Sequence, residues 1–194
     1  SGTLWLSTKP IMDLSPIYIT LKLGLLTTLV LLILSIPLGY FFAYSKWKIK
    51  VLFESLVMLP IVLPPTVLGF YYLSYLGPNS AVGAFFLEHF GFSFAFSFEG
   101  ILFGSIIYCL PFMITPITEG LRSIPKNLLH AAETMGKSKT SVLLNVMLPN
   151  IKQFILNGIM LTFAHTLGEF GLILMIGGKT VSYTHLTLPT KVTV

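Results

Sequence analysis

Four apolar runs, each long enough to cross a lipid bilayer, constrain the fold of this chain more than any other feature. They cover residues 17–44, 51–76, 100–117 and 154–176. A helix needs about 20 predominantly apolar residues to cross the hydrocarbon core. Only 10% of the residues are charged and the mean hydropathy is +0.86, whereas about a quarter of the residues are charged in soluble domains. The sequence therefore predicts an all-α integral membrane protein with about four spans.

Lysine and arginine are distributed unevenly among the connections, and this predicts the topology. The connection over residues 77–97 has none, whereas eight of the twelve lie in or beside the first and third connections. These eight are Lys46, Lys48, Lys50, Arg122, Lys126, Lys137, Lys139 and Lys152. Because short cytoplasmic loops are enriched in basic residues, we expect the first and third connections inside and the N-terminus outside. The cations are too dispersed for a nucleic-acid-binding patch, so no nucleic-acid partner is expected.

The polar segment over residues 123–149 separates the third run from the fourth. Ser123 is a candidate N-cap for a short helix, and Gly136 is suited to end it because glycine readily adopts the left-handed conformation. Ser138 is a candidate cap for a second helix. Pro149 has no amide hydrogen to lose, so it is well placed to open the next membrane helix. The segment predicts two short amphipathic helices at the cytoplasmic face.

Several kinds of site are excluded by the residues present. Gly136-Lys137-Ser138 mimics the end of a phosphate-binding loop, but that motif needs glycine where Ala131 stands and a preceding strand. ATP would therefore have to be bound by a separate chain. The single Cys109 cannot build a disulfide framework or a cysteine metal cluster.

Residues 1–13 begin without Met and lack the pattern of a signal peptide, so we expect the chain to start inside a longer one.

Three motifs carry a family resemblance. Ala131-Ala132 is followed after three residues by Gly136 and after nine more by the sequence VMLP, which ends at Pro149. The other two are LPIVLPPTVLGF at residues 59–70 and LGEFG at residues 167–171. The first resembles the EAA loop of bacterial ABC-importer permeases, with His130 in the place of the usual Glu. The other two resemble the second-span and fourth-span signatures of the molybdate/tungstate permease subunit.

The resemblance implies the type I importer permease fold, here over residues 1–178 and without the last span of the family pattern. It implies a pathway formed by two permease copies, two cytoplasmic ABC ATPases docked on the EAA loops, and an external oxyanion-binding protein. No cofactor is expected in this chain, because ATP and magnesium would be bound by the ATPase. A multi-pass location in a bacterial or archaeal plasma (inner) membrane follows. The residues implied in ATPase coupling are His130, Ala131, Ala132, Glu133, Gly136, Leu148 and Pro149.

Prolines in the second run predict an irregular backbone. Pro60, Pro64 and Pro65 each remove an amide donor, so the helix is broken or kinked, and the freed carbonyls must face protein or a water-filled cavity. A kinked packing helix would have the same pattern. Given the resemblance, amide groups and a hydroxyl along a neutral path would pass an oxyanion without trapping it. The candidate pathway residues are Pro64, Pro65, Thr66, Gly69, Gly168 and Glu169.

His165 and Glu169 are four residues apart and so lie on one helical face. Ionisable groups at membrane depth are functional candidates, and proton relay, metal ligation and a structural pair are all open. The structural role is favoured, because two groups make a short relay and further metal ligands are not evident. A membrane-embedded enzyme using this pair is the alternative from another functional class. We expect no catalytic residue and no metal site.

Two further regions carry weaker signals. The outer connection over residues 77–97 is rich in phenylalanine, and it suits either an interfacial aromatic belt or the docking of an external protein. Residues 179–194 are polar and too short to cross a membrane, and their SYTHLTLPT sequence resembles translated sequencing-adaptor sequence. We expect an atypical tail from a truncated or chimeric reading frame, with a genuine tail as the alternative. For the cargo, the resemblance implies an oxyanion, with molybdate or tungstate expected and a sulfate-like oxyanion or another small solute as the alternative.

Overall fold

The structure is a computed structural model that describes residues 15–168. Within that range it is helical and has no strand, which confirms the predicted all-α class. In chain order the elements are α1 (Ser15–Tyr44), α2 (Lys50–Val62), α3 (Pro65–Leu76), α4 (Ala81–Phe90), α5 (Phe98–Ser123), α6 (Lys126–Thr134), α7 (Lys139–Val142), the π-helical turn η1 (Leu143–Met147), α8 (Leu148–Asn150) and α9 (Lys152–Gly168). Glu169, the end of the predicted fourth run and the tail over residues 179–194 lie outside the described residues.

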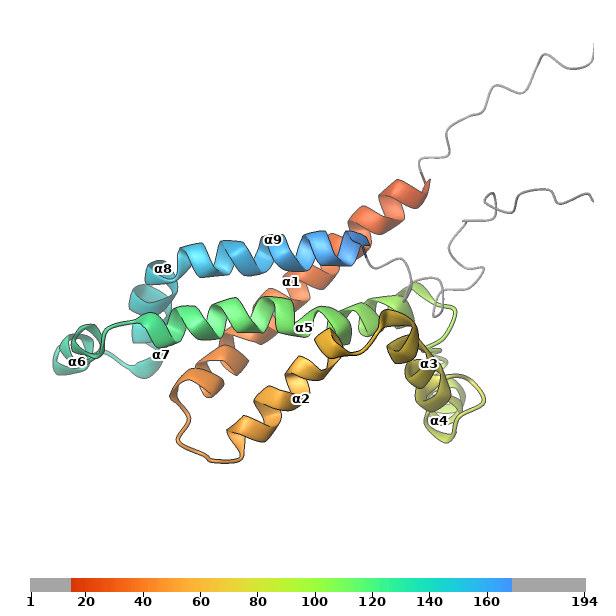
Figure 1. Cartoon of the computed structure of the whole chain (residues 1–194), viewed down its shortest axis with the longest axis horizontal. Coiled ribbons are helices and arrows are strands. Elements are labelled where there is room, and N and C mark those ends of the chain that lie inside the picture. The colour runs from red at the N-terminus through yellow and green to blue at the C-terminus, as the bar shows by residue number, and fades with distance from the viewer. Residues whose placement is uncertain (1–14, 169–194) are drawn as a thin grey trace, which may run out of the picture.

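Helices α1, α5 and α9 lie side by side and form the packed body of the protein (Figure 1). Leu31 of α1 and Met113 and Ile117 of α5 are fully buried between them. The outward faces are also apolar, as Leu25 of α1 and Met160 of α9 show with 63% and 70% exposure. Helices that are apolar on both sides suit a protein whose outer surface contacts lipid. The multi-pass membrane class predicted from composition is consistent with this arrangement.

The second apolar run is a sharply bent pair of helices. α2 and α3 meet at 113°, with Leu63 and Pro64 in extended conformations between them (ψ 131° and 140°). A proline disfavours the helical conformation in the residue before it, so the Pro64-Pro65 pair ends α2, and Pro65 is tolerated as the first residue of α3. The interrupted helix predicted from the prolines is present.

The third helix is longer than the sequence predicts, because α5 continues six residues beyond residue 117, to Ser123. Pro111 and Pro116 lie inside it without ending it. Ile117 and Leu121 recur at helical spacing and both are fully buried, so packing against the body stabilises the helix after the apolar run stops. Tertiary contacts therefore override the end that hydropathy suggests.

Length and composition allow two to four membrane crossings in the described range. The regions Ile17–Tyr44 and Phe98–Ser123 are each long and apolar enough to cross. Four crossings result if each bent pair, α2 with α3 and Lys139–Asn150 with α9, counts as one span; the latter pair bends by 74°. The number of four spans stays a prediction. α4 and α6 lie toward opposite ends of the molecule (Figure 1), so the two long connections occupy opposite ends of the packed body.

Candidate functional site

The segment that the sequence predicts to dock an ATPase, which we call the docking segment and define as residues 124–150, leaves the body at the end of α5. Ser123 is the last residue of α5, and its hydroxyl donates to the Gly120 carbonyl at 2.7 Å. The prediction that Ser123 caps the next helix is therefore wrong, because the buried residues of α5 extend that helix through it. Ile124 follows in an extended conformation, 7% exposed, and anchors the turn into α6.

Helix α6 has one buried side and one exposed side. Ala132 is 7% exposed and belongs to the same buried cluster as Ile124 and Val142. His130 and Ala131 are exposed, as is Leu128 at 37%. Glu133 also lies in α6. Among the predicted coupling residues of α6, Ala132 therefore faces the body, whereas His130 and Ala131 face outward.

Gly136 follows the end of α6 and has a backbone conformation that favours glycine. Its φ is +70°, in the left-handed region, and it is exposed. A side chain at this position would meet nothing within 4 Å, so the constraint is backbone strain and not space. Met135 beside it is 74% exposed. α6 ends at Thr134, close to the helix end that Gly136 predicts.

The second half of the docking segment returns the chain to the body. The Ser138 side chain accepts from the Ser141 amide at 3.3 Å, as predicted for an N-cap. The helix then passes through η1 and α8, and the chain bends at Ile151 into α9. Pro149 lies in α8 and is exposed, whereas Leu148 is half-buried. The prediction that Pro149 opens the membrane helix is wrong, since α9 begins three residues later, at Lys152.

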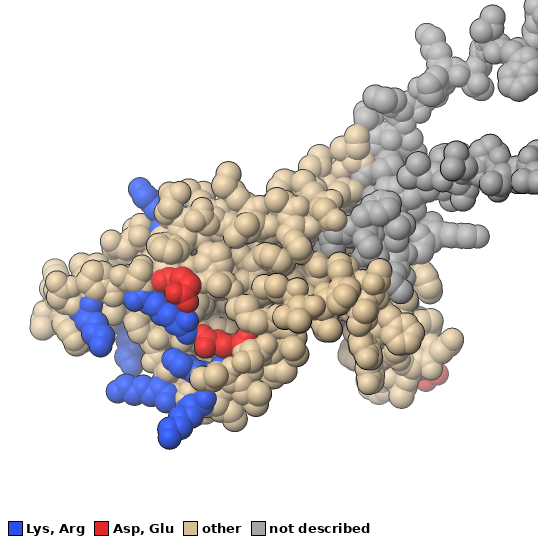
Figure 2. Space-filling model, viewed as in Figure 1, with Lys and Arg blue, Asp and Glu red and all other residues tan. Residues whose placement is uncertain are grey.

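Cations gather at the end of the molecule that carries the docking segment. Figure 2 shows lysine and arginine side chains concentrated there, whereas the part of this face formed by α3 and α4 shows none. Exposed cations at this end include Lys48, Lys126 and Lys139. The aromatic side chains of α4 are at the other end, with Phe85 50% and Phe90 70% exposed. The positive-inside rule predicts the cytoplasmic side of a membrane protein from such an uneven distribution of cations.

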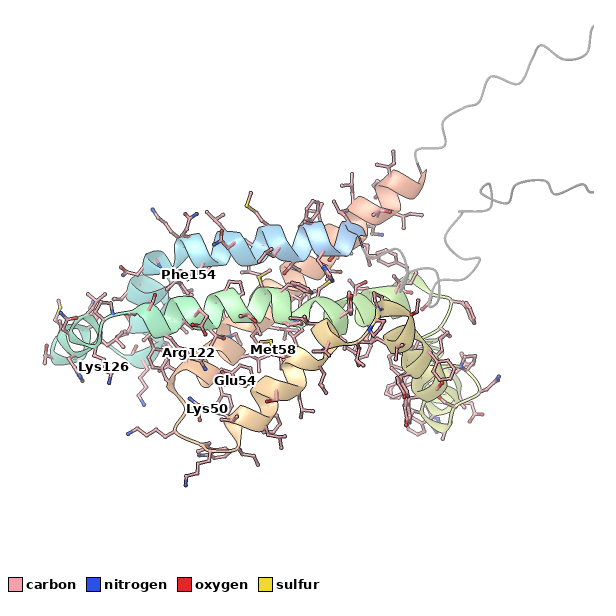
Figure 3. All side chains as sticks on the ribbon, in the orientation of Figure 1. Lys50, Glu54, Met58, Arg122, Lys126 and Phe154 are labelled. Carbon is pink, nitrogen blue, oxygen red and sulfur yellow. The ribbon has the colours of Figure 1, made fainter. Side chains whose placement is uncertain are left out.

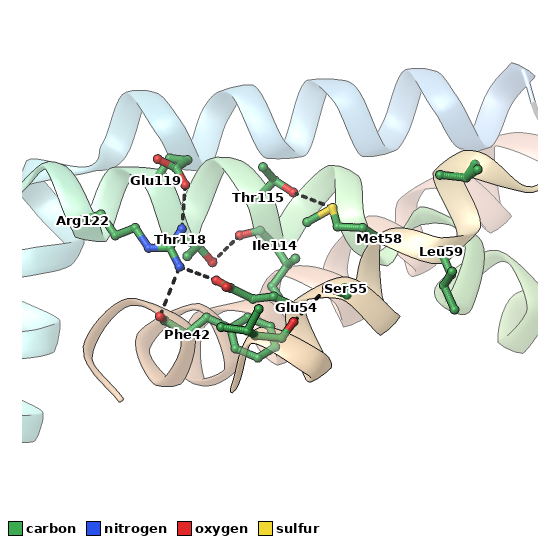
Figure 4. Close-up of a pocket in the computed structure, with 12 residues that line it drawn as sticks. Phe42, Glu54, Ser55, Met58, Leu59, Ile114, Thr115, Thr118, Glu119 and Arg122 are labelled. Carbon is green, nitrogen blue, oxygen red and sulfur yellow. Dashed lines mark hydrogen bonds and ion pairs between the residues drawn. The ribbon is translucent and has the colours of Figure 1, made fainter. Parts of the chain in front are cut away.

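A groove with a volume of about 440 Å³ opens between α2, α5 and the end of α1 (Figure 4). Arg122 lies at one end of it. Its guanidinium forms ion pairs with Glu54 of α2 and, at 2.9 Å, with Glu119, and donates to the Phe42 carbonyl at 3.3 Å. The lining residues are Phe42, Val51, Glu54, Ser55, Met58, Leu59, Val62, Ile114, Thr115, Thr118, Glu119 and Arg122.

None of the described candidate pathway residues lines this groove. Pro64 and Pro65 form the elbow between α2 and α3, Thr66 is exposed in the first turn of α3, and Gly69 is buried. Gly168 lies at the end of α9 and is exposed, and Glu169 is beyond the described residues. The groove and its ion pairs were missed by sequence reasoning. One signal was available, because Glu54 is the only acidic residue between residues 51 and 76.

His165 packs between aromatic rings of α5. Its ring centroid is 5.0 Å from that of Tyr108 and 3.9 Å from that of Phe112. Its Nε2 is buried and has no hydrogen-bond partner among the described residues, and no cluster of three metal-ligating residues occurs within the described range. His165 therefore lies in the interface between α9 and α5, and its predicted pairing with Glu169, which is outside the described residues, stays a prediction.

Comparisons with known proteins match the chain to one family and to permeases of several organisms. Residues 35–190 match the family described as binding-protein-dependent transport system inner membrane component. A molybdenum transport system permease protein from Azotobacter vinelandii is 36% identical, over 86% of this chain and 74% of that protein. Its counterpart in Haemophilus influenzae is 34% identical, over 82% and 70%. A molybdate/tungstate transport system permease protein from Methanocaldococcus jannaschii is 33% identical, over 81% and 61%.

Proposed function

The chain belongs to the family of inner-membrane components of binding-protein-dependent transport systems, and on this premise we propose that it is the permease subunit of an ATP-driven importer of molybdate or tungstate. The assignment of the cargo rests on one observation. The chain is 33–36% identical to permeases named for molybdenum, molybdate or tungstate transport, over more than four fifths of its length. The family consists of transport components, so the alternative of a membrane-embedded enzyme at His165 and Glu169 is set aside.

In this proposal the docking segment receives the ATPase. Its exposed surface combines small and apolar side chains, Ala131, Leu128 and Met135, with the cation Lys126 at the start of α6. Small residues allow a partner's surface to approach the helix backbone, and Ala132 holds the helix on the body from behind. His130 and Glu133 are the other proposed coupling residues of α6. Leu148 and Pro149 lie in α8, just before the chain bends into α9. The basic end is then cytoplasmic and the N-terminus is outside.

The cargo path in this proposal runs past the elbow between α2 and α3. Pro64 and Pro65 have no amide hydrogen, so Thr66 presents the first backbone donor of α3 together with its exposed hydroxyl. The positive end of a helix dipole and neutral donors favour an anion, and they do so without a fixed cation that would retain it. Gly69 lies one turn further along α3. Gly168 and Glu169 complete the proposed path from the fourth span.

A second copy of the chain supplies the other half of the path. The face of α2 turned away from the groove is apolar and exposed, as Leu52 (58%), Phe53 (48%) and Leu56 (49%) show. Such a face suits contact with a second copy or with lipid. The external binding protein delivers the oxyanion at the end that carries α4, and two ATPases bind at the other end, one on each docking segment.

The experiment for the cargo is ATP-dependent uptake by the assembled complex in proteoliposomes. The full chain, its ATPase and its binding protein are reconstituted, and accumulation of labelled molybdate is followed with and without ATP. We expect accumulation only with ATP, with competition by excess tungstate and little competition by excess sulfate. Equal or stronger competition by sulfate, or accumulation that does not depend on ATP, would contradict the proposal.

A further inference from the structure

The inner ends of α1, α2 and α5 meet in a group of polar contacts that the proposed function does not yet use. We call this group the inner node and define it as the Phe42 carbonyl, Lys50, Glu54 and Arg122. The Phe42 carbonyl accepts from Lys50 Nζ at 3.1 Å and from the Arg122 guanidinium at 3.3 Å. Because Phe42 is two residues from the end of α1, its carbonyl has no amide donor from within that helix. The two cations also lie at the negative end of the helix dipole.

Helix α2 faces α5 through a row of residues spaced by four. Lys50, Glu54 and Met58 lie along this row (Figure 3). Each contacts another helix: Lys50 bonds α1, Glu54 pairs with Arg122 of α5, and the Thr115 hydroxyl of α5 donates to the Met58 sulfur at 3.7 Å. The groove separates α2 from α5 along part of their length, and Pro60 is the only buried residue of α2. The attachment of α2 to the body therefore depends on these side-chain contacts.

Helices α1 and α5, by contrast, are joined firmly. Their interface contains fully buried residues such as Leu31 and Ile117, and at their inner ends the Tyr44 hydroxyl donates to the Leu121 carbonyl at 2.6 Å. Helix α2 is flanked by non-helical residues on both sides, the turn before Lys50 and the elbow at Leu63 and Pro64. A helix between two such connections can tilt as a unit while a close-packed body stays rigid.

Arg122 also adjoins the docking segment. It lies four residues before Lys126, where α6 begins, and the intervening Ile124 is buried against the same cluster as Ala132. A displacement of α6 therefore moves the end of α5 that carries the guanidinium. Building on the proposed function, we propose that the Arg122–Glu54 pair links movement of the docking segment to movement of α2, and through α2 to the elbow of the cargo path.

The pair fixes the position of α2 relative to α5 and contributes little to the folding stability of the protein. The Arg122 and Glu54 side chains are 37% and 26% exposed, and ion pairs with this exposure contribute little to folding. Glu119 provides a matched comparison because it bonds the same guanidinium from within α5, three residues away. Removing the charge of Glu119 perturbs Arg122 but keeps the ion pair between α5 and α2, whereas removing the charge of Glu54 eliminates that ion pair.

The first test compares Glu54→Gln with Glu119→Gln in the reconstituted complex. We expect Glu54→Gln to lower the molybdate transported per ATP hydrolysed by about fivefold or more, with ATPase assembly unchanged, and Glu119→Gln to leave this ratio within about twofold. Equal ratios for the two glutamine variants would overturn the inference.

The second test does not depend on the cargo. In a Cys109→Ser background, spin labels on Ser55→Cys of α2 and Gln153→Cys of α9 report how far α2 lies from the body, since both positions are exposed. We expect ATP binding by the complex to shift this distance in the wild-type pair and in Glu119→Gln, and not in Glu54→Gln. An identical shift in all three overturns the inference. Failure of the proposed cargo would instead appear as absent molybdate uptake by the wild-type complex, with the ATP-dependent shift retained.

Discussion

Replacing Gly136 by valine is expected to lower ATP-dependent uptake and the affinity for the ATPase by about 5- to 30-fold, while the permease still folds. Gly136 has a φ of +70°. The left-handed conformation costs a residue with a Cβ about 1–2 kcal/mol, and a β-branched side chain is an outlier there. Relief of that strain changes the path of the chain between α6 and α7, and it therefore displaces the surface on which the ATPase docks. Uptake and co-purification with the ATPase measure the effect.

The control is Gly136→Asn, because asparagine is the other residue that commonly adopts the left-handed conformation. A side chain at this position meets nothing within 4 Å, so asparagine and valine differ in strain and not in steric fit to this chain. We expect the asparagine variant to keep most of the uptake. Equal losses in the two variants would show that the backbone conformation of Gly136 is not what docking requires.

The second large effect is expected for Ala131→Arg, which should reduce the affinity for the ATPase by roughly 5- to 150-fold, since overpacking a close interface costs ~1–3 kcal/mol. Ala131 is exposed on α6, so the arginine lies outside the core and the thermal unfolding of the permease alone stays near that of the wild type. Binding of the ATPase is measured on the purified permease. Unchanged binding would mean that this face of α6 is not the contact.

The neighbouring alanine provides the comparison. Ala132 is 7% exposed and packs in the cluster with Ile124 and Val142, so Ala132→Arg places a charge in an apolar site and should lower the unfolding temperature as well as the binding. Ala131→Arg should lower binding alone. If both variants unfold early, the orientation of α6 described here is incorrect.

The sequence predicts the parts of this fold that depend on local chemistry. The Pro64-Pro65 pair ends α2 at the bend, Gly136 adopts the left-handed conformation close to the end of α6, and Ser138 caps α7. Each of these outcomes follows from the dihedral preferences or hydrogen bonding of a residue and its immediate neighbours. Such preferences act at short range along the chain, so they can be recognised without knowing the tertiary structure.

The features that depend on tertiary contacts were missed. α5 extends through Ser123 because residues such as Leu121 are buried against the body, and hydropathy along the sequence does not report that burial. Pro149 precedes the bend instead of opening α9. Glu54 and Arg122 are 68 residues apart. A lone acidic residue in an apolar run indicates that Glu54 has a partner, but neither local sequence indicates that the partner is Arg122. The groove is lined by residues of α1, α2 and α5, so it could be found only in the folded chain.

Site-directed photo-cross-linking from α6 tests the central claim, that the docking segment binds the ATPase, most directly. In a Cys109→Ser background, a thiol-linked photoreactive probe is placed at Ala131→Cys on α6 or at Val82→Cys on α4, two exposed positions on helices that lie toward opposite ends of the molecule. The assembled complex is irradiated and the adducts are identified by mass spectrometry. The account predicts an ATPase adduct from Ala131→Cys and none from Val82→Cys. An ATPase adduct from Val82→Cys, with none from Ala131→Cys, would contradict it.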